Sequence, residues 1–251
     1  MEFYWHYVLY LVLGILVGII NTIGGGGTGL LYPLLIFMGM SPHMAVGTAR
    51  LSMLTQGLFG FLGFRSSGYF LYPFNLYLSV SALTGCIFGS FLSMEIPEGM
   101  YKKLIAVVIT MTTLLLFFGN QKRKPGTQPR VHGKYLFLSI ILFFILGIYI
   151  GIVQTGIGFL MLIPLMLINK LDIHQANSVK VMVLFIASIP ALIIFAMFGY
   201  VSWPAAIALA IGTSLGSYFT GKFSVRIPER KLKIFIAAMV IFLAVRLWVF
   251  D

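Results

Sequence analysis

Long stretches of this chain contain no charged side chain, and this feature restricts the chain to a membrane. No Asp, Glu, Lys or Arg occurs from Phe3 to Ala49, and the same holds for residues 66–94, 104–121, 135–169, 181–221 and 234–245. A helix that crosses a bilayer needs about 20 mostly apolar residues. Several stretches are therefore long enough for one span, and some for two. Because the apolar runs are continuous rather than alternating, they predict membrane helices and not an outer-membrane barrel.

The composition excludes a water-soluble globular protein. Hydrophobic residues make up 60% of the chain and charged residues 9%, whereas a soluble domain has roughly 45–50% and about 25%. The formal net charge of +11 would suggest nucleic acid in a soluble protein. In a membrane protein, Lys and Arg collect instead in cytoplasmic loops. We therefore expect the lipid bilayer, and no nucleic acid, as a partner.

The sequence contains an internal repeat. Tyr32-Pro33-Leu34 matches Ile163-Pro164-Leu165, and Ile96-Pro97-Glu98 matches Ile227-Pro228-Glu229, both at an offset of 131 residues. Each copy reads as five apolar segments. They span residues 7–23, 29–39, 43–64, 71–93 and 101–119 in the first copy, and 135–155, 158–169, 174–198, 203–221 and 231–250 in the second. The sequence therefore predicts an all-α integral membrane protein built from two repeats.

The second segment of each copy is too short to cross a bilayer. A segment of about 11 residues covers roughly 16 Å, which is about half of the hydrocarbon core. Glycines precede it in both copies, as Gly24–Gly27 in the first and as Gly156 and Gly158 in the second. Four consecutive glycines disfavour continuous helix, so we expect a broken helical hairpin in each repeat. Such open backbone must face protein or a water-filled cavity; close helix packing is the alternative explanation for the glycines.

Basic residues predict the orientation of the chain. The central linker, residues 120–134, contains five Lys and Arg and is expected in the cytoplasm, between a first repeat at 1–119 and a second at 135–251. The loop before the last segment is also basic in the second copy, whereas its counterpart in the first copy has no net charge. Equivalent loops then lie on opposite sides, which predicts inverted repeats in the cell membrane with both termini external.

Two basic residues lie deep within predicted spans. Arg50 is eight residues beyond Pro42 and Lys180 eight beyond Asp172, each roughly 12 Å along its helix. Charges at membrane depth are functional candidates, although either side chain could instead extend to an interface. Since no acidic residue lies within a span, an anion is the expected counter-charge. Polar or glycine residues expected to share this site are Asn21, Thr22, Gly25, Gly26, Gly27, Thr48, Gln56, Gln154 and Thr155.

Several motifs resemble the sulfite exporter TauE/SafE family of membrane transporters. The resemblance is carried by GIINTIGGGGTGLLYPLL and SPHMAVGTARLSMLTQGLFGFLGFRSSG in the first half, and by GIYIGIVQTGIGFLMLIPLM, ANSVKVMVLF and GYVSWPAAIALAIGTSLGSYFTGKF in the second. It implies transport of anions such as sulfite, thiosulfate or organosulfonates. By position, Gly24–Gly27, Thr48, Arg50, Gln56 and Lys180 fall in the family's recurring motifs.

These observations predict a transporter for small anions, with its site near the midplane between the two broken hairpins. An anion channel or uncoupled facilitator on the same scaffold is the alternative. An intramembrane enzyme would need a metal or nucleophile constellation such as HExxH or a Cys/His cluster. None occurs in the sequence, so we expect no catalytic residues, no metal and no cofactor.

Overall fold

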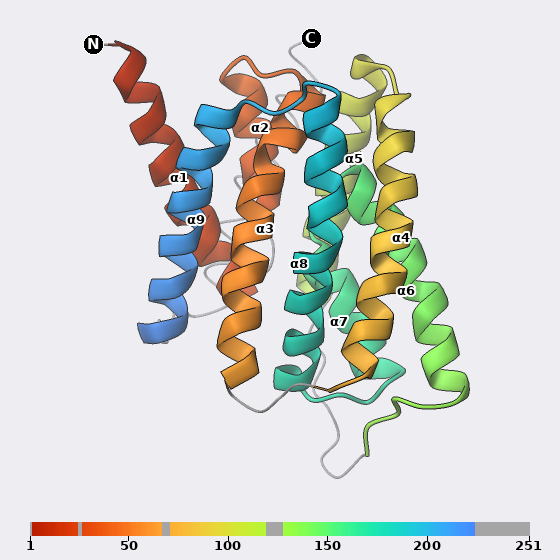
Figure 1. Ribbon diagram of the computed structural model, residues 1–251. Helices are drawn as coiled ribbons and strands as arrows, with labels where there is room; N and C mark the ends of the chain where they lie inside the picture. The colour runs from red at the N-terminus through yellow and green to blue at the C-terminus, as the bar shows by residue number, and fades with distance from the viewer. Residues whose placement is uncertain (1, 25–26, 67–70, 119–127, 224–251) are drawn as a thin grey trace.

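The computed structural model describes residues 2–24, 27–66, 71–118 and 128–223, which form nine α-helices and no strands (Figure 1). The helices are α1 (Glu2–Gly24), α2 (Thr28–Phe37), α3 (Pro42–Ser66), α4 (Phe74–Met94), α5 (Glu98–Phe118), α6 (Lys134–Ile152), α7 (Ile157–Leu167), α8 (Ile173–Met197) and α9 (Trp203–Phe223). Each corresponds to one predicted apolar segment. The tenth predicted segment, residues 231–250, lies outside the described residues.

The helices confirm the predicted class, an all-α membrane protein. Among the described residues, α4, α6 and α8 are long and apolar enough to cross a membrane. Side-chain caps mark the starts of two helices. Asp172 caps α8 in a reciprocal capping box with Gln175, and the Ser41 hydroxyl accepts a hydrogen bond from the Met44 N–H at the start of α3.

Corresponding helices of the two halves run in opposite directions. In Figure 1, α1 and α3 descend while α6 and α8 ascend, and α4 ascends while α9 descends. The start of α6 and the α7–α8 connection share the lower end, whereas the α4–α5 and α8–α9 connections lie at the upper end. These directions are the ones that inverted halves require. The duplication itself, and the placing of the lower end in the cytoplasm, remain predictions from the sequence.

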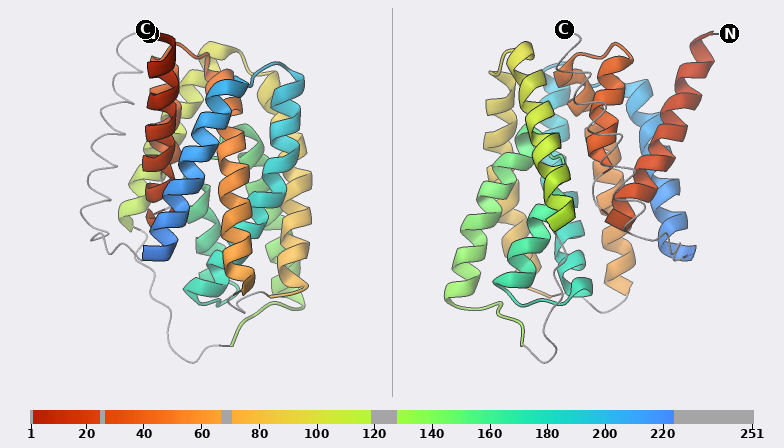
Figure 2. Two further views of the ribbon diagram at one scale, coloured as in Figure 1. Left: turned by 60° about the vertical axis from the view of Figure 1, so that its left-hand side comes forward. Right: turned by 180° about the vertical axis from the view of Figure 1, so that it is seen from behind.

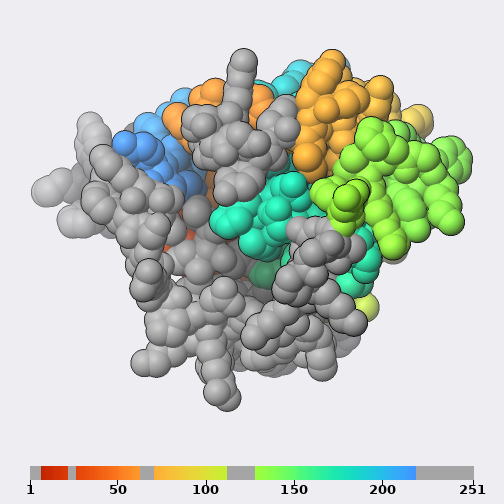
Figure 3. Space-filling model, turned by 90° about the horizontal axis from the view of Figure 1, so that it is seen from below, coloured from red at the N-terminus to blue at the C-terminus, as the bar shows by residue number. Residues whose placement is uncertain are grey.

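The space-filling view from below shows the start of α6 and the α7–α8 connection side by side on the lower face (Figure 3). Hydrogen bonds join the two segments. The Arg130 N–H donates to the Asn169 carbonyl at 2.7 Å, and the Asn169 side-chain amide donates to the Arg130 carbonyl at 2.9 Å. The Asn169 side chain also bonds the Ser139 hydroxyl of α6. The end of α7 is thereby fixed to the beginning of α6.

Helices from opposite halves pack closely through glycines. The α1–α9 pair and the α4–α6 pair stand at opposite sides of the bundle (Figure 2). A Cβ atom on Gly14 of α1 would lie 2.5 Å from the Leu209 carbonyl oxygen of α9, and one on Gly147 of α6 would collide with the Ala82 carbonyl of α4. These two glycines therefore allow close helix packing.

Substitution of Gly151 tests this packing. A Cβ at Gly151 would lie 2.5 Å from the Ser90 backbone nitrogen of α4, so Gly151→Ala forces the helices apart and should destabilise the fold by about 1–3 kcal/mol. Gly99→Ala is the matched control, because no atom lies within 4 Å of its Cβ position. Thermal unfolding of the purified variants in detergent should show a lower melting temperature for Gly151→Ala alone. Equal melting temperatures would contradict the close α4–α6 contact.

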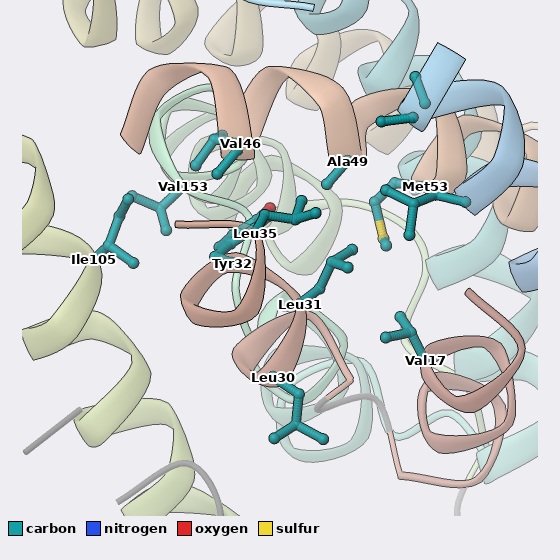
Figure 4. Packing of buried hydrophobic residues seen from close by; sticks show 14 of the residues in the cluster. Val17, Leu30, Leu31, Tyr32, Leu35, Val46, Ala49, Met53, Ile105 and Val153 are labelled. Atoms are coloured by element: carbon teal, nitrogen blue, oxygen red, sulfur yellow. The ribbon is translucent and has the colours of Figure 1, made fainter. Parts of the chain in front are cut away.

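The short helix α2 lies inside the protein. Its ten residues extend about 15 Å, half of what a span requires. Figure 4 shows its side chains among residues of α1, α3 and α5 and the segment that follows α6. The labelled residues of this cluster are Val17, Leu30, Leu31, Tyr32, Leu35, Val46, Ala49, Met53, Ile105 and Val153. The amino end of α2 therefore meets protein rather than lipid, whereas Phe37 at its carboxyl end is exposed.

Candidate functional site

Arg50 of α3 lies at the end of α6. The Arg50 side chain is fully buried, and its Nη1 donates to the Ile150 carbonyl at 2.6 Å and to Gln154 Oε1 at 2.5 Å. Its Nη2 donates to the Gly151 carbonyl at 2.7 Å, and its Cζ lies 4.8 Å from the centre of the Phe195 ring. The last carbonyls of a helix lack partners within the helix and carry its partial negative charge. Arg50 therefore caps the carboxyl end of α6.

This arrangement corrects one expectation about Arg50. Its positive charge already has acceptors in the protein, so an anion is not its sole counter-charge. The side chain also does not extend to an interface, because the guanidinium is enclosed. Among the described residues, the Nε of Arg50 is the guanidinium nitrogen without a hydrogen-bond partner.

The connection from α6 to α7 holds two further predicted site residues. Gln154 and Thr155 are both buried, and Gln154 has φ of 60°, a left-handed conformation that is uncommon outside glycine. The Gln154 side chain is held on both sides, because its Oε1 accepts from Arg50 and its Nε2 donates to the Ser188 hydroxyl of α8 at 3.3 Å. Gly156 is also left-handed, with φ of 66°, and α7 begins immediately after it. The helix is thus interrupted at the predicted position.

Tyrosine hydroxyls brace the same connection. Tyr101 of α5 donates to the Ile152 carbonyl, and Tyr149 of α6 donates to the Thr155 carbonyl. Neither tyrosine was a candidate from the sequence. A tyrosine within an apolar helix is not marked by the sequence as a site residue. The partners of Tyr101 and Tyr149 are backbone carbonyls, which any residue carries. Only the fold brings them to this place.

A separate polar group occupies the other break, between α1 and α2. Asn21 Oδ1 accepts from the Gly27 N–H at 2.7 Å, and Asn21 Nδ2 donates to Gln56 Oε1 at 3.1 Å. Gln56 Nε2 in turn donates to the Ser217 hydroxyl of α9 at 3.0 Å. Asn21, Gly27 and Gln56 therefore belong together, while Arg50 belongs to the other break. Gly25, Gly26 and the side chain of Thr22 lie outside what the structure describes.

Thr48 and Lys180 belong to neither cluster. The Thr48 hydroxyl accepts a hydrogen bond from the Ser202 N–H at 3.0 Å, which joins α3 to the α8–α9 turn. Lys180 is half-buried on α8. No described residue forms a hydrogen bond or an ion pair with its ammonium group.

The fold and the two breaks together define a class of protein. Interrupted helices with buried or partly buried polar groups at both interruptions are typical of membrane transporters. The family model "Sulfite exporter TauE/SafE" matches residues 10–247, and the chain belongs to that family. The protein is therefore a membrane transporter and not an enzyme.

Curated relatives agree with this assignment. The chain is 22% identical to the probable membrane transporter protein ORF9 of Sinorhizobium sp, over 97% of this chain and 93% of that protein. It is 24% identical to a probable membrane transporter protein of Haemophilus influenzae, over 84% of this chain and 82% of the relative. Identity to the probable membrane transporter protein YdhB of Bacillus subtilis is 25%, over 90% of this chain and 93% of YdhB. No solved structure matches the chain.

Proposed function

We propose that this transporter carries small anions, above all sulfur-containing oxyanions or organosulfonates of the sulfite, thiosulfate or sulfoacetate type. Its site lies near the midplane between the two broken hairpins. The protein resides in the cell membrane, with the basic linker 120–134 in the cytoplasm and both termini external. Residues 1–119 and 135–251 act as the two inverted repeats. The name of the family supports the sulfur chemistry.

The observation that carries this proposal is that Arg50 and Lys180 have no carboxylate partner among the described residues. A charge within a membrane is costly unless it is paired. The carboxyl end of α6 pairs with Arg50, whereas Lys180 has no partner among the described residues. An anion supplies the charge that Lys180 lacks. The amino ends of the half-helices α2 and α7 add backbone N–H groups and positive dipole ends.

Flux into liposomes tests the proposal. Purified protein should give saturable uptake of sulfite, thiosulfate or sulfoacetate, and an internal load of the same anion should accelerate that uptake by counterflow. Small carboxylates and sulfate serve as comparison substrates. Flux restricted to carboxylates would overturn the substrate class. Anion conductance without counterflow would overturn carrier transport in favour of a channel or uncoupled facilitator.

A further inference from the structure

Three buried polar atoms around the α6–α7 break have no partner. They are the Tyr32 hydroxyl, Arg50 Nε and the Thr155 hydroxyl, and each belongs to a side chain that is at most 1% exposed. A buried polar atom left unpaired costs about 1–3 kcal/mol, so buried polar groups in native proteins are nearly always satisfied. Thr155 lies in this break and Arg50 contacts its neighbour Gln154, so these unpaired atoms point to a ligand that binds there.

The three atoms reach the break from three different elements. Arg50 comes from α3 and contacts Gln154, the neighbour of Thr155. Tyr32 comes from α2, and it belongs to the same buried cluster as Val153, the residue before Gln154. Tyr149 of α6 donates to the Thr155 carbonyl. In Figure 4, Tyr32 lies beside α3 with Val153 next to it, so the hydroxyl is enclosed by α3 and the α6–α7 connection.

The chemistry of the three atoms indicates which class of ligand they can bind. Each of them carries a hydrogen that it can donate, and the Arg50 guanidinium places a positive charge among them. The break also presents the amino end of α7, whose first N–H groups lack partners within the helix. A group that satisfies these donors beside a positive charge must offer several acceptor oxygens and a negative charge. A sulfonate group, with three oxygens, fits this description better than a carboxylate with two.

We propose that the Tyr32 and Thr155 hydroxyls, together with Arg50 Nε, bind the oxygens of the transported anion and select trioxo sulfur groups over carboxylates. This inference rests on the proposed function and adds the residues that discriminate between anions. A site built to hydrogen-bond a ligand strongly rejects an analogue that leaves its buried donors unpaired. Tyr32 is the specificity-determining residue that the sequence did not indicate.

Tyr32→Phe tests the inference, since it removes one oxygen atom and keeps the packed ring. Binding is measured by titration of the purified protein in detergent with methanesulfonate and with acetate, which differ in the oxyanion group. The wild type should bind methanesulfonate more tightly than acetate. Tyr32→Phe should lower the affinity for methanesulfonate at least about tenfold and the affinity for acetate by less. Thr155→Val should act in the same direction. The melting temperature of ligand-free Tyr32→Phe should stay level or rise, because an unpaired buried hydroxyl is lost.

Tyr77→Phe is the matched control. It makes the same chemical change on the exposed face of α4, so it should alter neither the dissociation constant nor the melting temperature. A Tyr32→Phe protein that binds methanesulfonate as tightly as the wild type overturns the inference. So does one that loses stability with an unchanged dissociation constant, because its hydroxyl then serves the fold. A wild type that binds no sulfur oxyanion overturns the proposed function instead.

Discussion

Lys180→Gln should abolish anion transport and leave the fold intact. Lys180 is half-buried on a membrane helix, and no described residue pairs with its ammonium, so its removal breaks no hydrogen bond or ion pair within the described residues. Loss of a charge-assisted contact with the substrate weakens binding by about 2–5 kcal/mol, which corresponds to a reduction of roughly 30-fold or more in transport at low substrate concentration. The measurement is initial flux into liposomes, with the melting temperature recorded on the same preparation.

Lys103→Gln provides the control for this prediction. Lys103 is an exposed residue in the first turns of α5, and the same substitution there should leave flux and melting temperature unchanged. Lys180→Arg, which keeps the charge on a different geometry, should retain part of the flux. If Lys180→Gln transports the anions as fast as the wild type, Lys180 has no part in the site.

The helices could be predicted from the sequence because a membrane makes their signal strong. Long runs of apolar residues have few alternatives in a bilayer, and each of the nine described helices lies where an apolar segment was identified. The break before α7 was equally visible, since Gly156 adopts a left-handed conformation that glycine tolerates best. Features that depend on neighbouring residues in the sequence, such as the apolar segments and the break before α7, could therefore be predicted.

The partners of the site residues could not be predicted, because they are distant in the sequence and are mostly backbone. Arg50 donates to the carbonyls of Ile150 and Gly151, which are 100 and 101 residues away. A carbonyl acceptor leaves no mark on residue identity, so the lack of carboxylates suggested an unpaired charge. Tyr32 was missed for the same reason, because the role proposed for its hydroxyl depends on residues that are distant in the sequence. Thr48 likewise has a distant partner, since its hydroxyl accepts from the Ser202 N–H.

Separate roles for the two basic residues explain why the protein uses an arginine at one break. A guanidinium donates in several fixed directions, so Arg50 can bridge two carbonyls and the Gln154 side chain at once. A lysine ammonium is a compact charge on a flexible side chain and suits a ligand that binds and dissociates. This difference leads to an unequal effect of substitution at the two positions.

Arg50→Ala should lose both transport and stability, in contrast to Lys180→Gln. It leaves the Ile150 and Gly151 carbonyls and Gln154 Oε1 buried without their donor, and each such atom costs about 1–3 kcal/mol. The variant should still insert into the membrane, because its apolar segments are unchanged, but its melting temperature in detergent should fall well below that of Lys180→Gln. Arg50→Lys keeps the charge without the fork of donors, so it should recover only part of the loss. A melting temperature of Arg50→Ala equal to that of the wild type would show that Arg50 does not hold the end of α6, and the α6–α7 break would then need another source of stability.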